Sequence, residues 1–257
     1  MSAERRFRSI EMLQEFRLSA RADPSGDYED SRKLSLPENH PRHLKRLHSH
    51  GELVADGLVH VGAIVSGIVG MTTLFRLVAI RGGIAEGLSI TVYAAGFFSM
   101  FGFSLAYNMT PPSPLKWLLR RFDHSSIYLM IAGTYTPLLY QLQSRTWAWA
   151  LAILVWVGAI AGVVLKVALP GRFDRLSIAV YLLLGWVAAI AAKPLIDSLS
   201  TATLVLIAAG GLLYSAGIIF YFWHSLRFQN AIWHSFVAAA AACHYAAIAG
   251  CVARAGA

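Results

Sequence analysis

Charged side chains are scarce in this sequence of 257 residues: Asp, Glu, Lys and Arg together make up 14% of it, against roughly 25% in an ordinary soluble domain. Cysteine is scarcer still, with Cys243 and Cys251 as its two positions. They lie eight residues apart on one expected helix and cannot bridge each other, which excludes a fold held by internal disulfides. Residues 231–252 contain no Lys, which excludes a retinal protein with its Schiff base on the last helix.

Apolar residues are abundant and make up 56% of the sequence. From about residue 52 onward they gather in stretches of about 20 residues, each long enough to cross the roughly 30 Å hydrocarbon layer as a helix. The sequence therefore predicts an all-α integral membrane protein with a seven-helix transmembrane bundle at 51–257. The expected segments are 53–75, 87–109, 124–143, 147–168, 175–193, 200–223 and 231–252.

Residues 1–50 differ in composition from the rest of the chain. They are polar and carry ten Lys and Arg, and the stretch 23–30 with Pro37 and Pro41 is typical of a flexible linker. We expect these residues to form a basic, partly flexible cytoplasmic extension that precedes the transmembrane domain.

Lys and Arg lie unevenly on the two sides of the expected bundle. One side carries 17 of them, including the ten in residues 1–50, and the other side carries five. Because basic residues are retained on the cytoplasmic side, the amino terminus is predicted to be cytoplasmic and the carboxyl terminus outside. The net charge of +8 thus indicates membrane orientation and not nucleic-acid binding, and membrane lipids are the expected partners. The sequence makes no prediction about oligomeric state.

Polar and ionisable side chains gather at one expected depth near the cytoplasmic side, several of them in pairs four residues apart that share a helix face. Such groups inside a membrane usually face a bundle interior or a wet cavity, so they indicate an inner-leaflet pocket. A second interpretation is that they are interface residues that meet headgroups and water without a common direction. The layer comprises Glu52, Asp56 and His60 on the first helix, Ser104 and Asn108 on the second, Asp123 and His124 at the start of the third, and Asn230 and His234 at the start of the seventh.

A further histidine, His244, lies ten residues beyond His234, about 15 Å deeper by helical rise. We expect it to be a separate hydrogen-bonded core histidine.

Five blocks of this sequence resemble the hemolysin III family, which belongs with the progestin and adipoQ receptors. The resemblance implies seven helices with the amino terminus inside, and a similarity to zinc-dependent membrane hydrolases such as alkaline ceramidases. The blocks are ELVADGLVHVGAI at 52–64, SLAYN at 104–108, RFDHSSIYLMIAGTYTP at 121–137, GGLLYSAGIIFY at 210–221 and AIWHSFV at 231–237.

The resemblance also implies site residues, of which some match and some do not. Ser104, Asp123 and His234 match the family's pattern, whereas Asn108 and Asn230 stand where that pattern has His. A neutral carboxamide oxygen is a poor zinc donor, since this ion prefers imidazole, thiolate or carboxylate. The resemblance therefore supports the fold strongly and the metal weakly. A relocated zinc site would combine His234 with His60 and Asp123, and Asp56, which we assign to the pocket, is a further residue that could complete it.

Three functions follow from these observations. The first is a degenerate relative, non-catalytic or weakly metal-binding, whose polar pocket binds a lipid or a partner. The second is a zinc-dependent hydrolase of a lipid amide or ester, in which Ser104 donates a hydrogen bond to the developing oxyanion and Asp123 acts as orienting group or general base. The third is a pore-forming or cytolytic protein, which the family name indicates. The basic loops fit a bacterial inner membrane.

Overall fold

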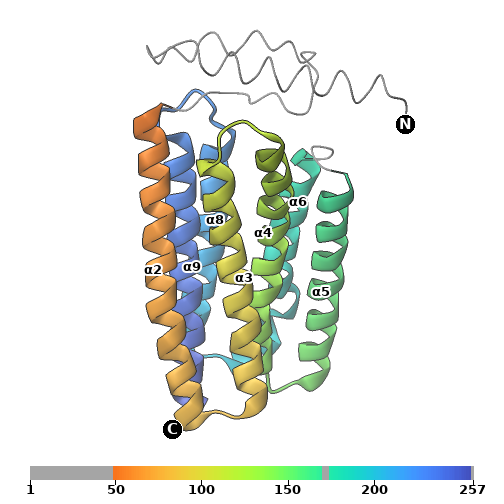
Figure 1. Cartoon of the computed structure of the whole chain (residues 1–257). Coiled ribbons are helices and arrows are strands. Elements are labelled where there is room, and N and C mark those ends of the chain that lie inside the picture. Colours follow the sequence, from red (N-terminus) through yellow and green to blue (C-terminus); the bar gives the residue numbers. More distant parts are fainter. Residues whose placement is uncertain (1–48, 170–173, 256–257) are drawn as a thin grey trace, which may run out of the picture. The chain divides into compact units, whose positions relative to one another are not determined.

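The computed structural model describes residues 49–169 and 174–255, so nearly all of the predicted extension at 1–50 lies outside the described residues. The described part of the chain is helical throughout, without strands. Successive long helices alternate in direction (Figure 1). The elements are α2 (His50–Arg81), α3 (Ile84–Met109), α4 (Pro114–Tyr140), α5 (Arg145–Ala168), α6 (Asp174–Gly185), the 3₁₀ helix η2 (Val187–Ala191), α7 (Ala192–Ser198), α8 (Thr201–Phe222) and α9 (Gln229–Ala255).

Serine residues begin several of these helices. The hydroxyl groups of Ser113, Ser144 and Ser200 each accept a hydrogen bond from the backbone N–H three residues further on, which satisfies a donor that has no partner inside the helix. At α4, Ser113 is followed by proline at the first helical position, where its missing N–H costs nothing. This helix therefore starts ten residues earlier than its apolar composition predicts. Asp123 and His124 lie in its third turn and not at its start, which corrects the expectation above.

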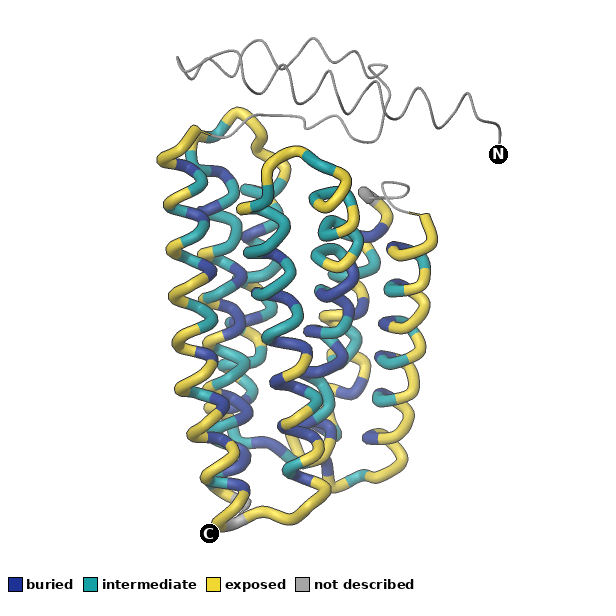
Figure 2. Tube along the Cα trace, in the orientation of Figure 1, coloured by how far each residue is buried: buried dark blue, intermediate teal, exposed yellow. Residues whose placement is uncertain are grey.

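The outward faces of the helices are exposed (Figure 2), and many of the exposed residues are large and hydrophobic, as α5 illustrates well. Its outer stripe is more than half exposed although every residue in it is aliphatic, while its inner stripe is buried. A face of this kind would drive aggregation in water, but it is the expected surface of a helix surrounded by lipid. The outer stripe is Ile153, Val157, Ile160 and Val164, and the inner stripe is Leu151, Val155 and Ala159.

Within the described ranges, six helical segments are long and apolar enough to cross a membrane, and α4 is the seventh long helix. It is less apolar than the others because it carries four charged residues in its first three turns and buries polar side chains such as Ser125, Ser126 and Thr134. It packs against α3, α5, α6 and α9, so neighbouring helices cover much of it. The expected all-α, seven-helix membrane fold is confirmed, while the sidedness of the membrane stays a prediction.

The fifth expected segment, 175–193, is not one continuous helix. It is divided into α6, η2 and α7. Pro194 in the first turn of α7 lacks the N–H that would bond to the Ile190 carbonyl, so η2 does not continue into α7 as one regular α-helix. Tyr135 of α4 satisfies backbone groups at the break: its hydroxyl donates to Gly185 O at 2.7 Å and accepts from Ala188 N at 3.0 Å. An interrupted helix is tolerated in a bilayer where neighbouring side chains bond to the freed groups in this way.

Helices α3 and α4 pack closely because two glycines face each other across them. A Cβ on Gly96 would stand 2.7 Å from the Leu129 carbonyl oxygen, and one on Gly133 would stand 3.1 Å from that of Val92. Small residues at such a crossing let the two backbones approach. The two helices are antiparallel, so moving forward along α3 and backward along α4 leads to the same level of the bundle. Ser104 lies eight residues after Gly96, and Asp123 lies ten residues before Gly133, so the two side chains are brought to a similar level.

Candidate functional site

The site is built first on α2, whose Asp56 and His60 are 2% and 0% exposed. Asp56 lies six residues into the helix, about 9 Å from its start. The Nδ1 atom of His60 is 2.8 Å from the Asp56 backbone oxygen. Because a carbonyl only accepts hydrogen bonds, Nδ1 carries the proton, and in the neutral ring Nε2 is the nitrogen with the free electron pair.

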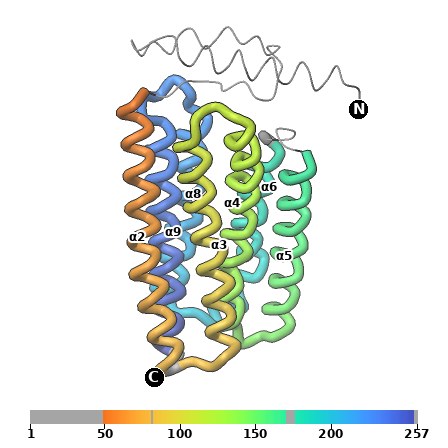
Figure 3. The backbone as a smooth tube through the Cα atoms, viewed as in Figure 1, coloured from red at the N-terminus to blue at the C-terminus, as the bar shows by residue number. Residues whose placement is uncertain are grey.

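His234 of α9 lies directly opposite these two residues. Its Nδ1 atom is 2.5 Å from Asp56 Oδ1, and its ring centre is 4.3 Å from that of His60. α2 and α9 both begin at the same end of the bundle and run side by side in the same direction (Figure 3). Residues near the starts of the first and last long helices therefore meet in one cluster.

Ser104 of α3 lies between the two histidines. Its Oγ atom is 3.0 Å from His60 Nε2 and 3.4 Å from His234 Nε2. Since His60 Nε2 accepts when the ring is neutral, the Ser104 hydroxyl donates to it. Asp56, His234, Ser104 and His60 thus form a ring of polar contacts drawn from three helices.

Asn108 and Asn230 lie at the edge of this ring and contact each other. Asn108 Nδ2 donates to the Ser104 backbone oxygen at 2.9 Å and to its Oγ atom at 3.3 Å. Asn230 Nδ2 donates to Asn108 Oδ1 at 3.4 Å. Each side chain has a hydrogen-bonding role here, and neither belongs to the group of candidate metal ligands.

Asp123 brings a fourth helix, α4, to the cluster. Its carboxylate interacts with Ser104 and, through charge, with His234, and its side chain is 16% exposed. The neighbouring His124 has its Nε2 atom 3.9 Å from Asp123 Oδ2. Asp123 therefore lies beside the ring of four residues, and His124 lies next to Asp123.

Three residues of the cluster are suited to hold a metal ion. Ligand atoms of Asp56, His60 and His234 all lie within 4.8 Å of one another, and imidazole and carboxylate are donors that zinc prefers. The Asp56 Oδ2 atom is buried and has no hydrogen-bond partner, so one ligand oxygen is available without breaking an existing bond. The residues fit such an ion. The acidic member of this group is Asp56, where the sequence favoured Asp123.

His244 lies elsewhere in the bundle. Its Nε2 atom bonds to the Ile207 carbonyl oxygen at 3.2 Å, and its ring packs against Tyr214 with centres 5.7 Å apart. It contacts α8 and is not a member of the ligand group.

Two residues that support the cluster carry no signal in the sequence. Lys116, which looks like an ordinary basic loop residue, donates from Nζ to the carbonyl oxygens of Tyr107 and Thr110 at 2.8 and 2.7 Å and so holds the end of α3. Phe228, directly before α9, has a backbone φ of 59°, a conformation that a non-glycine residue rarely adopts.

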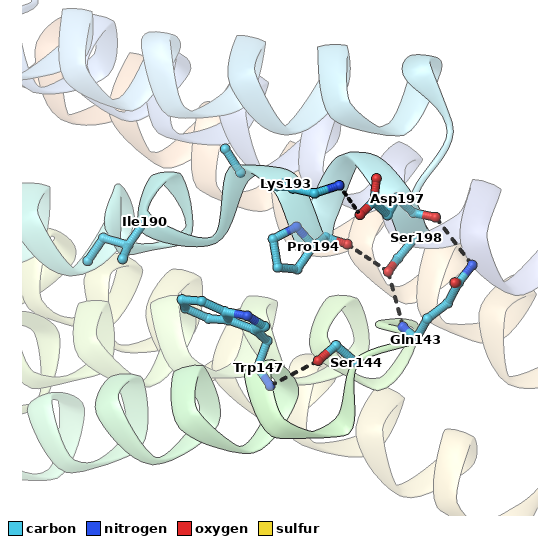
Figure 4. Close-up of a pocket in the computed structure, with 9 residues that line it drawn as sticks. Gln143, Ser144, Trp147, Ile190, Lys193, Pro194, Asp197 and Ser198 are labelled. Carbon is cyan, nitrogen blue, oxygen red and sulfur yellow. Dashed lines mark hydrogen bonds and ion pairs between the residues drawn. The ribbon is translucent and has the colours of Figure 1, made fainter.

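A surface pocket of about 450 Å³ lies at the opposite end of the bundle, where α4 ends and α5 begins. Figure 4 shows Trp147 beneath Lys193 and Pro194, with Lys193 paired to Asp197 at 3.1 Å. Lys193 and Asp197 are exposed, and no residue of the polar cluster lines this pocket. It is separate from the candidate site.

The fold and the cluster define a class: a helical membrane protein that crosses the bilayer several times and holds a buried centre of histidine and carboxylate groups. A model of the family described as "Haemolysin-III related" matches residues 48–245. The chain therefore belongs to this family, and the resemblance to the hemolysin III family is confirmed.

Individual relatives cover most of the chain. The "Hemolysin-3 homolog" of Bacillus subtilis (strain 168) is 38% identical over 186 residues, which are 72% of this chain and 87% of the relative. "Hemolysin-3" of Bacillus cereus is 36% identical over 187 residues, 72% and 85% of the two chains. "Monocyte to macrophage differentiation factor" of Homo sapiens is 29% identical over 203 residues, 77% and 83% of the two chains.

Proposed function

We propose that this protein is a metal-dependent membrane hydrolase of a lipid ester or amide, with zinc held by Asp56, His60 and His234. The observation that carries the proposal is the group of three ligands within 4.8 Å of one another, of which Asp56 and His60 are buried and His234 is 12% exposed. Asp56 and His60 lie about 9–15 Å from the start of α2. At this depth, the acyl bond of a lipid in the predicted cytoplasmic leaflet can reach the ligands from the side. The Bacillus relatives support placing the protein in a bacterial plasma membrane.

The burial of Asp56 supports a cation at this position. A buried carboxylate with one unpartnered oxygen is costly, because taking a charge out of water is offset only by an opposite charge or by hydrogen bonds. The described residues give Oδ2 of Asp56 no such partner. A divalent ion between this carboxylate and the two imidazoles would remove that cost.

Bound zinc would supply hydroxide near neutral pH by lowering the pKa of its water. Because an ion held by His60 would take the electron pair of Nε2, the Ser104 hydroxyl, which otherwise donates to that nitrogen, would be free to donate to the oxygen that gains charge as the acyl carbon is attacked. Asp123, beside Ser104, is placed to hold the proton that the attacking water loses. Asn108 and Asn230 orient Ser104 and take no part as ligands.

Metal analysis of the full chain, purified gently and placed in lipid nanodiscs, tests the proposal. We expect about one zinc per chain in the wild type and a loss of zinc in Asp56→Asn and His234→Ala. His224→Ala is a matched control because this histidine is exposed. His244→Gln is a second, since it replaces a histidine of the same helix outside the ligand group. Both controls should keep the ion. A wild type without metal, or loss in the controls alone, contradicts the proposal.

A second candidate function is binding of a lipid or partner without catalysis. The hydrogen bond between Asn108 and Asn230 favours it, because it occupies the two positions where the family resemblance implies metal ligands. Under this alternative, purified protein carries no zinc, hydrolyses no lipid ester or amide, and retains a co-purified lipid that Asn108→Leu displaces. Channel activity in planar bilayers, abolished by Ser104→Ala, would instead support a pore.

A further inference from the structure

The first and last long helices are joined in one fixed register. Three contacts between α2 and α9 link residues whose numbers differ by 176, 178 and 175. A nearly constant difference means that two parallel helices neither slip nor separate along their shared length. The three contacts join Phe228 N to Glu52 Oε1 at 3.0 Å, His234 Nδ1 to Asp56 Oδ1 at 2.5 Å, and Tyr245 OH to Gly70 O at 3.0 Å.

Glu52 caps both of these helices at once. Its Oε2 atom accepts from the backbone N–H of Ser49, the residue before α2, at 2.9 Å, while the Ser49 hydroxyl accepts from Glu52 N. This is the reciprocal capping box of a helix start. Its Oε1 atom accepts from the backbone N–H of Phe228, the residue before α9, at 3.0 Å. This carboxylate, 5% exposed, thus accepts the hydrogen bond from the residue before α9 that a side chain in the first turn of the same helix usually accepts.

Phe228 starts α9 in an unfavourable backbone conformation. Its carbonyl oxygen accepts from Ile232 N at 3.0 Å, so the helix begins with this residue. Its φ of 59° lies in the left-handed region, which costs energy for any residue except glycine. The bond to Glu52 points the Phe228 N–H toward α2 and holds this conformation in place.

We propose that Glu52 is a positioning residue of the site, which sets the start and rotation of α9 and thereby holds His234 against Asp56 and Ser104. His234 lies six residues beyond Phe228, so a change in where α9 starts changes the position and direction of the His234 side chain. A slip of one residue moves a side chain by about 1.5 Å along the helix and turns it by about 100°. Such a slip would separate His234 from both partners. Of the two measurements below, only that of zinc affinity depends on the proposed function.

The test uses Glu52→Ala in the full chain in nanodiscs, with two readouts. Zinc affinity should fall about 10–100-fold, as is typical when a residue that supports a ligand is lost. Hydrogen exchange of the amides of residues 229–236 should quicken about ten-fold or more, while exchange near Tyr245 should change little. Ser49→Ala is the matched control, since it weakens the cap of α2 and leaves the bond between Glu52 and Phe228 intact. It should leave zinc affinity and exchange at the start of α9 unchanged.

A second substitution separates positioning from general stability. Glycine adopts a φ of 59° without cost, so adding Phe228→Gly to Glu52→Ala should restore most of the zinc affinity and slow exchange again. Failure of this rescue, or unchanged exchange in Glu52→Ala, overturns the inference. If Glu52→Ala does not accumulate, Glu52→Gln, which has one acceptor oxygen, replaces it. If the wild type binds no zinc, the proposed function fails, and hydrogen exchange alone decides the role of Glu52.

Discussion

Gly162 of α5 permits a contact that a methyl group would disrupt. A Cβ at this position would stand 2.3 Å from the Cε1 and Cζ atoms of Tyr128 on α4, more than 1 Å inside ordinary van der Waals contact. Tyr128 is 1% exposed, and its ring packs against Tyr181 of α6 with centres 4.5 Å apart. The ring therefore cannot move aside, and in Gly162→Ala the two helices must separate.

The expected cost follows from two opposing contributions. Overpacking a well-filled core costs about 1–3 kcal/mol, and replacing glycine by alanine inside a helix returns about 0.5–1 kcal/mol. Gly162→Ala should therefore lower the free energy of unfolding by about 1–2 kcal/mol. Gly102→Ala on α3 is the matched control, because no atom lies within 4 Å of its added Cβ. At that position only the higher helix propensity of alanine acts, and the free energy of unfolding should rise by up to about 1 kcal/mol.

Thermal unfolding in detergent measures both variants. The two cysteines are free, Cys251 buried and Cys243 half-buried, so a thiol-reactive fluorophore labels the chain as it unfolds. With about 2–4 °C per kcal/mol for a chain of this size, the midpoint should fall by about 2–8 °C in Gly162→Ala and rise by up to about 4 °C in Gly102→Ala. Equal shifts of one sign in the two variants would refute the packing argument.

Two further predictions concern hydrogen bonds that hold backbone groups inside the bundle. Tyr135→Phe leaves two backbone groups at the break between α6 and η2 without their partner and should cost about 1–2 kcal/mol. Tyr140→Phe, at an exposed position, should cost nothing measurable in the same assay. Lys116→Met keeps the aliphatic stem but removes the donor to two carbonyls at the end of α3, and should cost about 1–3 kcal/mol. Lys193→Met, 87% exposed, is its control, and equal midpoints for the two lysine variants would contradict the role given to Lys116.

Helix number and the polar layer could be predicted from the sequence because both depend on simple periodicity. Runs of about 20 apolar residues require spanning helices, and residues four apart share one helix face. Asp56 and His60 illustrate the second rule, since both meet His234 as a pair. Spacing alone does not give the rotation of one helix about its axis relative to another. The sequence therefore favoured Asp123 beside His234, whereas in the structure Asp56 completes the ligand group.

The break in the fifth segment was missed for a related reason. Within the expected segment 175–193, the residues around the break are all apolar, so composition alone predicts one continuous helix. Pro194, just beyond the expected end, interrupts the segment between η2 and α7, and the hydroxyl of Tyr135 from another helix bonds to the backbone groups at the break between α6 and η2. The left-handed conformation of Phe228 was missed because glycine is the residue that usually adopts it. Here the conformation is held by a hydrogen bond to the carboxylate of Glu52, which is distant in the sequence.

The contribution of α9 to the cluster has a consequence for biosynthesis. Translation produces Asp56, His60, Ser104 and Asp123 well before His234, so an insertion intermediate with its first six hydrophobic segments in the membrane carries an incomplete set of ligands. The segment from Phe228 onward supplies both the missing imidazole and the backbone N–H that donates to Glu52. A nascent chain that stalls before this point lacks His234, so the group of three candidate ligands forms only after α9 has been made.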